Sequence, residues 1–205
     1  RQMCIRDRCI TLSSNQSSSG NLIKNNTCIG SNIYANNVDS IVGNRVSGVE
    51  NNIGIWLGGG SSTIANNYIT TSGLGTSKGI SLESGCSNSK VLFNSINNVG
   101  TNSSSSICLE TSGSLTGLVV KNNIFGSTGG GMPISVGSAL SGHDWDYNCY
   151  YSPNGNVGSY NGTVYTDLST LGATMGSDAN SLNMDPYFVS DTNLLISQRQ
   201  LNGAG

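Results

Sequence analysis

The sequence predicts an all-β fold, a right-handed parallel β-helix (solenoid) of about six coils, because two short units alternate along most of the chain. The first unit alternates apolar and other residues over five positions, the period of a half-buried strand. Its copies are residues 54–58, 79–83, 106–110 and 133–137, with weaker copies at 10–12 and 33–35. The first isoleucines of successive copies lie 22 to 27 residues apart, as in Ile33 to Ile55 and Ile107 to Ile134.

The second unit ends in an asparagine and changes its spacing together with the first. An apolar residue stands three positions before each aligned asparagine. Asparagine tolerates the left-handed backbone of a sharp bend, and stacked amides can hydrogen-bond along a stack. We therefore expect an asparagine ladder between two sheets, formed by Asn25, Asn44, Asn67, Asn94, Asn122 and Asn148.

Stacked coils place like residues above one another, about 4.8 Å apart, in three parallel sheets. No single coil can bury its apolar face alone, so the repeats must stack to form a core. A β-sandwich would show strands joined by hairpin turns without a repeated asparagine corner. A leucine-rich repeat needs more leucines at fixed places in each repeat.

The asparagine corners and the Gly-Ile-x-Leu strands resemble the right-handed β-helix repeat family, which includes pectate lyase-like proteins. The resemblance covers about residues 9–151. It implies that the Gly-Ile-x-Leu strands form the first sheet. It also implies that the outer face of this sheet and the loops before it, residues 70–78, 97–106 and 126–132, form a polysaccharide groove.

The two ends of the chain differ from the repeat. Residues 1–8 carry a dense run of charge that fits nothing downstream, and we interpret them as a non-native leader. Residues 152–205 are expected to form an incomplete cap or extension, with a short helix at 165–171 and strands at 185–189 and 193–196. An open final coil would invite edge pairing, so a solenoid needs such a cover. This end also resembles β-helix modules of large secreted bacterial surface proteins, which implies a longer parent chain with other domains.

Composition narrows the function classes. The net charge of −2 gives no basic footprint, so we expect no nucleic-acid partner. No apolar run approaches the roughly 20 residues of a membrane span. The six cysteines show no CxxC spacing, which disfavours zinc, and their pairing cannot be read from the sequence. The resemblance to secreted modules implies a secreted or cell-surface protein.

The outward positions of the first sheet hold the candidate site. Glu83 and Glu110 occupy equivalent places in the two repeat copies, so we expect their backbones about 4.8 Å apart. Trp56 and Ser81 are expected on the same face, where an indole can stack on a sugar ring. The carbohydrate-binding candidates are thus Trp56, Ser81, Glu83 and Glu110.

Three chemical roles are open for the two glutamates. Both are candidate Ca²⁺ ligands, but calcium takes six to eight oxygens and two carboxylates are too few. They are also candidate catalytic groups, since carboxyl groups about 5–5.5 Å apart suit a retaining glycosidase. The third role is sugar contact. The structural alternative is that they splay into solvent, paired with Lys78 or Lys90.

Supporting catalytic groups are sparse. Lyases that resemble this repeat need a Lys or Arg base, and the outward positions that we assign hold neither. Hydrolases of the polygalacturonase type carry a Gly-His-Gly motif, which residues 142–144 echo only in part, so we expect a structural or surface role for His143. Our first hypothesis is therefore a non-catalytic module that requires no cofactor and contacts polysaccharide. The alternatives are a polysaccharide lyase or glycoside hydrolase, and a structural stalk or adhesin segment.

Overall fold

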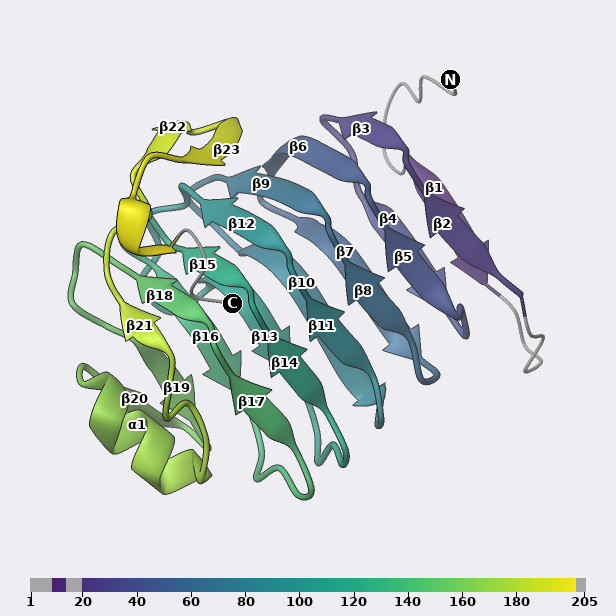
Figure 1. Cartoon of the computed structure of the whole chain (residues 1–205). Coiled ribbons are helices and arrows are strands. Elements are labelled where there is room, and N and C mark those ends of the chain that lie inside the picture. Colours follow the sequence, from purple (N-terminus) through teal and green to yellow (C-terminus); the bar gives the residue numbers. More distant parts are fainter. Residues whose placement is uncertain (1–8, 14–19, 202–205) are drawn as a thin grey trace.

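The computed structural model describes residues 9–13 and 20–201, and it shows a parallel β-solenoid of about six coils (Figure 1). The predicted leader, residues 1–8, lies outside the described residues. Three parallel sheets run the length of the stack, and each coil contributes one strand to each sheet in turn. The predicted all-β fold class is confirmed.

Sheet A is the predicted first sheet. Its strands, in spatial order, are β1 (Ile10–Ser13), β4 (Ile33–Asn36), β7 (Ile53–Gly59), β10 (Ser77–Gly85), β13 (Ser106–Thr111), β16 (Met132–Val136), β19 (Gly158–Tyr160) and β20 (Thr163–Tyr165). All neighbours pair in parallel except β19 and β20, which are antiparallel.

Sheets B and C flank the asparagine corner. Sheet B consists of β2 (Leu22–Lys24), β5 (Ser40–Val42), β8 (Thr63–Ala65), β11 (Lys90–Leu92), β14 (Val119–Lys121) and β17 (Asp144–Asp146). Sheet C consists of β3 (Thr27–Ile29), β6 (Arg45–Glu50), β9 (Tyr68–Ser72), β12 (Ser95–Asn98), β15 (Ile124–Gly126), β18 (Cys149–Tyr151) and β21 (Leu182–Asn183).

Hydrogen bonds between asparagines join the coils at the corner between sheets B and C. The Oδ1 atom of Asn67 accepts from the backbone N–H of Asn44 at 2.9 Å and from its Nδ2 at 3.0 Å. The Nδ2 of Asn67 donates in turn to Asn94 Oδ1 and to the carbonyl of Ile41, both at 2.9 Å. The same pattern joins all six members of the ladder, which are Asn26, Asn44, Asn67, Asn94, Asn123 and Asn148.

The predicted ladder members Asn25 and Asn122 are wrong by one residue, because the chain carries Asn-Asn doublets there. Both residues precede the true member and adopt the left-handed backbone, with φ of 56° and 58°. The ladder asparagines themselves do not, so the bend and the amide stacking belong to neighbouring residues. With the corrected alignment, the residue three before and the residue two after every ladder asparagine are buried.

The pairing of β10 with β13 also differs from the sequence alignment. We expected Ile80 to lie beside Ile107, but Ile80 pairs with Leu109 and Leu82 pairs with Thr111. A slip of two residues keeps every side chain on the same face of a strand, so the alternating pattern cannot detect it. As a result Glu110 lies beside Ser81, not beside Glu83.

The C-terminal segment covers the last coil. Helix α1 (Leu168–Met175) begins after Asp167, whose side chain accepts from the Thr170 N–H, so it starts three residues later than predicted. Strands β22 (Phe188–Ser190) and β23 (Asn193–Ile196) form an antiparallel hairpin, followed by the 3-10 helix η1 (Arg199–Leu201). The hairpin lies over sheet C (Figure 1), where Arg45 donates to the Thr192 carbonyl at 2.8 Å. In the described residues no helix is long and apolar enough to cross a membrane.

Replacement of Asn67 by Ala should strongly destabilise the solenoid. Two buried donors of Asn44 and the Ile41 carbonyl would lose their partner, at about 1–3 kcal/mol for each unsatisfied group. We expect a loss of about 3 kcal/mol or more in the free energy of unfolding, measured by urea denaturation. Asn66→Gly is the matched control, because Asn66 lies in the left-handed position outside the ladder and should change stability by less than about 1 kcal/mol. Equal losses in the two variants would contradict the ladder's role.

Candidate functional site

The predicted site residues gather on the outer face of sheet A. The pairing of strands places Tyr34, Trp56, Ser81 and Glu110 in one outward column, in four successive coils. Glu83 lies two residues further along β10 from Ser81, in the next outward column. We refer to this patch, defined by Tyr34, Trp56, Lys78, Ser81, Glu83 and Glu110, as the sheet A face.

An aromatic pair forms one half of the sheet A face. The rings of Tyr34 and Trp56 are stacked, with centroids 3.8 Å apart and planes 10° from parallel. The indole reaches over Gly58, where a Cβ atom would come within 2.1 Å of the ring. Any larger residue at position 58 would displace the indole. The sequence analysis identified Trp56 but missed Tyr34. Tyr34 could have been found from its place in the weak repeat copy at residues 33–35.

The polar half of the face is a connected chain of hydrogen bonds. Glu83 accepts from Trp56 Nε1 at 3.0 Å and from Ser112 Oγ at 2.6 Å. Glu110 forms an ion pair with Lys78. The Ser81 hydroxyl lies between the two carboxylates, 3.4 Å from Glu83 and 3.2 Å from Glu110. The four predicted carbohydrate-binding residues are therefore brought together, but Ser81 is fully buried, and Trp56, Glu83 and Glu110 are the ones that keep exposed surface.

Two details of the predicted site are corrected. Glu83 and Glu110 are not equivalent in adjacent coils, because of the two-residue slip described above. Lys78, which the outward positions assigned from the sequence omitted, lies at the position beside Ile107 and reaches Glu110. Of the two lysines considered as partners, Lys78 makes the ion pair, whereas Lys90 lies on sheet B. Among the described residues no three or more His, Cys, Asp or Glu side chains group as metal ligands.

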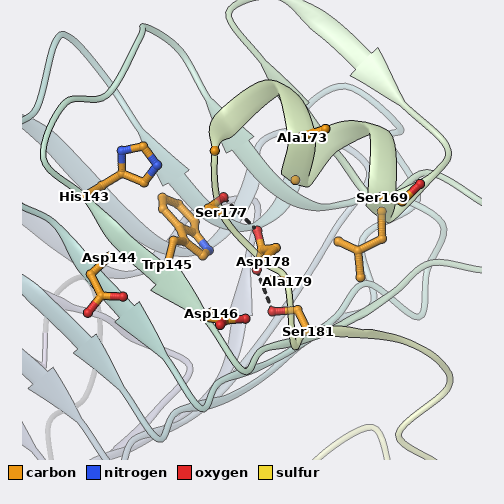
Figure 2. A pocket seen from close by; sticks show the side chains of 13 residues that line it. His143, Asp144, Trp145, Asp146, Ser169, Ala173, Ser177, Asp178, Ala179 and Ser181 are labelled. Carbon is orange, nitrogen blue, oxygen red and sulfur yellow. Dashed lines mark hydrogen bonds between the residues drawn. The ribbon is translucent and has the colours of Figure 1, made fainter.

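A cavity of about 790 Å³ lies between the last coil and the cap (Figure 2). Strand β17 and its preceding residue His143 line one side, and α1 with residues 176–179 and Ser181 lines the other. Most of its polar groups already have partners in the cap or in the neighbouring coil. Asp146 accepts from both the backbone and side-chain nitrogens of Asn180 at 2.7 Å, and Asp144 forms an ion pair with Lys121 at 2.6 Å.

A buried hydrogen-bonded chain crosses this seam. Trp145 Nε1 donates to the Tyr150 hydroxyl at 2.9 Å, and that hydroxyl donates to Asp178 Oδ1 at 2.8 Å. Ser181 also donates to Asp178, at 2.6 Å, and accepts from the Asn148 N–H at 2.9 Å. Ser181 thus takes the place of the next ladder asparagine. Burial raises the pKa of the Asp178 carboxyl above its ordinary value.

His143 lines the cavity, and neither of its ring nitrogens has a hydrogen-bond partner in the described structure. Its neighbours Asp144 and Asp146 are engaged with Lys121 and Asn180, so they do not converge on it. We interpret the cavity as space that remains because the cap fills only part of the place that a seventh coil would occupy. The polar groups of the sheet A face instead adjoin an aromatic surface, which makes that face the better candidate site.

Asp178→Asn should stabilise the protein at neutral pH and reduce its pH dependence. The pKa of Asp178 is raised in the folded state, so as pH rises above 3.8 the unfolded chain loses this proton first and stability falls. Asparagine stays neutral, can still accept from Tyr150, and tolerates the left-handed φ of 59° at this position. In melts from pH 7 down to pH 4, the advantage of the variant should shrink as pH falls. An advantage that grows towards pH 4 would contradict this assignment.

Comparison with protein families, with curated proteins and with solved structures found no match for the chain in any of the three. The structure therefore supports a parallel β-solenoid, and the more specific resemblance to pectate lyase-like proteins depends on the repeat pattern alone. The geometry of the sheet A face is therefore the basis for a proposed function.

Proposed function

We propose that this chain is a carbohydrate-binding module of a secreted or cell-surface bacterial protein, and that it holds a polysaccharide along the sheet A face. The observation that carries the proposal is the stacked Tyr34–Trp56 pair beside the hydrogen-bonded chain of Glu83, Ser81 and Glu110. Aromatic side chains offer large apolar area with little loss of entropy. The half-buried carboxylates of Glu83 and Glu110 beside them can accept hydrogen bonds from sugar hydroxyls, whereas Ser81 is fully buried beneath the face.

Binding without cleavage is the function that this geometry supports best. A retaining hydrolase needs two carboxyl groups that face each other across the glycosidic bond. Here the Ser81 hydroxyl stands between Glu83 and Glu110, and each carboxylate already has a further partner. Lys78, the nearby basic group, is engaged with Glu110. These contacts make a rigid polar surface, which suits recognition.

The repeat pattern and the cysteines support the context of the proposal. The asparagine corners resemble the pectate lyase-like superfamily, in which the corresponding face contacts polysaccharide. Cys9 and Cys28, in the first described coils, form a disulfide. Disulfides persist mainly in oxidising compartments, in keeping with export. The other three described cysteines, Cys86, Cys108 and Cys149, are buried thiols.

Trp56→Ala should abolish or greatly weaken binding of acidic polysaccharide by the sheet A face. Loss of one stacked ring, with loss of the Glu83 hydrogen bond, should weaken affinity about tenfold or more, equivalent to at least about 1.4 kcal/mol. The measurement is retardation in native gels that contain acidic polysaccharides, with and without Ca²⁺. Tyr68→Ala is the control, since Tyr68 is an exposed aromatic residue on sheet C. No retardation of the wild type by any polysaccharide would favour a stalk.

The same samples test for catalysis. We expect no release of reducing or unsaturated ends by the wild type, and no difference between it and the double variant Glu83→Gln/Glu110→Gln. Cleavage by the wild type that is lost in the double variant would overturn the non-catalytic assignment. It would also place a lyase or hydrolase activity on the sheet A face. Dependence of that cleavage on Ca²⁺ would revive the metal-ligand hypothesis for the two glutamates.

A further inference from the structure

The residue before each ladder asparagine forms a second column along the corner between sheets B and C. Every member has a positive φ, and the members are Asn25, Gly43, Asn66, Phe93, Asn122 and Tyr147. Asparagine and glycine suit this conformation, whereas for other residues it costs roughly 1–2 kcal/mol. The four positions held by Asn or Gly follow this rule. Phe93 and Tyr147 break it.

The two aromatic residues do not recover this cost by burial. Phe93 has φ of 54° and is 51% exposed, and Tyr147 has φ of 58° and is 44% exposed. Tyr150, and not Tyr147, is buried in the core under the cap. Backbone strain of this kind persists mainly where it serves a function. The exposed rings at strained positions therefore point to a role outside folding.

A small cavity lies between these rings. Its volume is about 110 Å³, and Phe93, Asn122 and Tyr147 line it together with Asn180, Leu182 and Leu201 from the cap. The rings stand two coils apart, so their backbones are separated by about 10 Å along the stack. A cavity of this size holds several water molecules, so it has room for part of a ligand's sugar ring.

The polar groups of the cavity define what would fill it. The side chains of Asn122 and Asn180 line the cavity, although the Oδ1 atom of Asn122 is itself enclosed by protein atoms. No charged side chain lines the cavity, in contrast to the sheet A face with its two glutamates and a lysine. A suitable ligand is uncharged, can form hydrogen bonds with amide groups, and has an apolar face that can lie against an aromatic ring. A neutral sugar chain has these properties.

We propose that the corner between sheets B and C is a second binding site, specific for a neutral glycan, in which Phe93 and Tyr147 stack on sugar rings beside the uncharged cavity that they line. The site shares no residue with the sheet A face. The proposal of a corner site does not depend on polysaccharide binding to the sheet A face.

Phe93→Asn and Tyr147→Asn test the proposal, because they remove the rings while installing a residue that suits the left-handed backbone. Each variant should weaken affinity for a neutral polysaccharide about tenfold, and its thermal midpoint should stay the same or rise. Affinity would be measured by retardation in native gels containing hydroxyethyl cellulose or galactomannan. Polygalacturonate would serve as the acidic probe, on which the variants should have no effect.

Tyr187→Asn is the matched control. Tyr187 is also an exposed tyrosine with a left-handed backbone, at φ of 48°, and it does not line the cavity. It should leave affinity unchanged. Trp56→Ala should also leave retardation by the neutral probes intact, which separates this site from the sheet A face.

Three results would overturn the proposal. The first is unchanged affinity in both corner variants, including the case in which Trp56→Ala alone removes binding of the neutral probes. The second is a wild type that neither neutral probe retards. The third is a lower thermal midpoint in both corner variants, which would show that the rings serve packing.

Discussion

The hydrogen-bonded stack of buried asparagines is the constraint on which the rest of this solenoid depends. Each Oδ1 accepts from both the backbone and the side chain of the preceding coil, so the ladder satisfies polar groups that would otherwise be buried without partners. This arrangement permits only one height and one register for each corner. The apolar residues three before and two after each asparagine are then directed into the core. The two sheets that meet at the corner inherit their alignment from it.

The ladder also determines what each surface can display. On sheet A, stacking places Tyr34, Trp56, Ser81 and Glu110 in successive coils, so an aromatic pair adjoins a polar group. At the corner, the column beside the ladder must take a left-handed backbone, and the aromatic residues within it are therefore conspicuous. Both surfaces are regular scaffolds on which a few departures from the repeat carry the chemistry. Gly58 is one such departure, since its missing side chain makes room for the indole of Trp56.

The cap ends the repeat by imitating it. Ser181 accepts from Asn148 as the next asparagine would, and the Asp178 N–H donates to the Trp145 carbonyl at 2.8 Å, as a further strand of sheet B would. The buried chain from Trp145 through Tyr150 to Asp178 then holds the cap on the core. Because the imitation is incomplete, a cavity remains beside β17. The cap therefore stabilises the last coil and closes an edge that could pair with another chain.

The sequence alone determined the architecture, because periodic burial and the asparagine corner are local patterns that repeat in every coil. It also identified Trp56, Ser81, Glu83 and Glu110 as one group on one face, since position within a repeat fixes which face a residue occupies. Four of the six ladder asparagines followed from the same pattern. The doublet at Asn25–Asn26 could have been resolved by requiring an apolar residue two positions after the asparagine, because Thr27 is polar and Cys28 is not. The same rule leaves the doublet at Asn122–Asn123 open, since Ile124 and Phe125 are both apolar.

Only the tertiary structure decided the registers and the partners. A two-residue slip between β10 and β13 preserves the alternation, so the sequence pattern does not distinguish the two registers. The observed register places Thr111 beside Leu82 and Glu110 beside Ser81. The ion pair of Lys78 with Glu110, the stacking of Tyr34 on Trp56 and the unpartnered amide of Asn122 all depend on distances between coils. Such distances arise when different coils come together, and a pattern within one coil does not contain them.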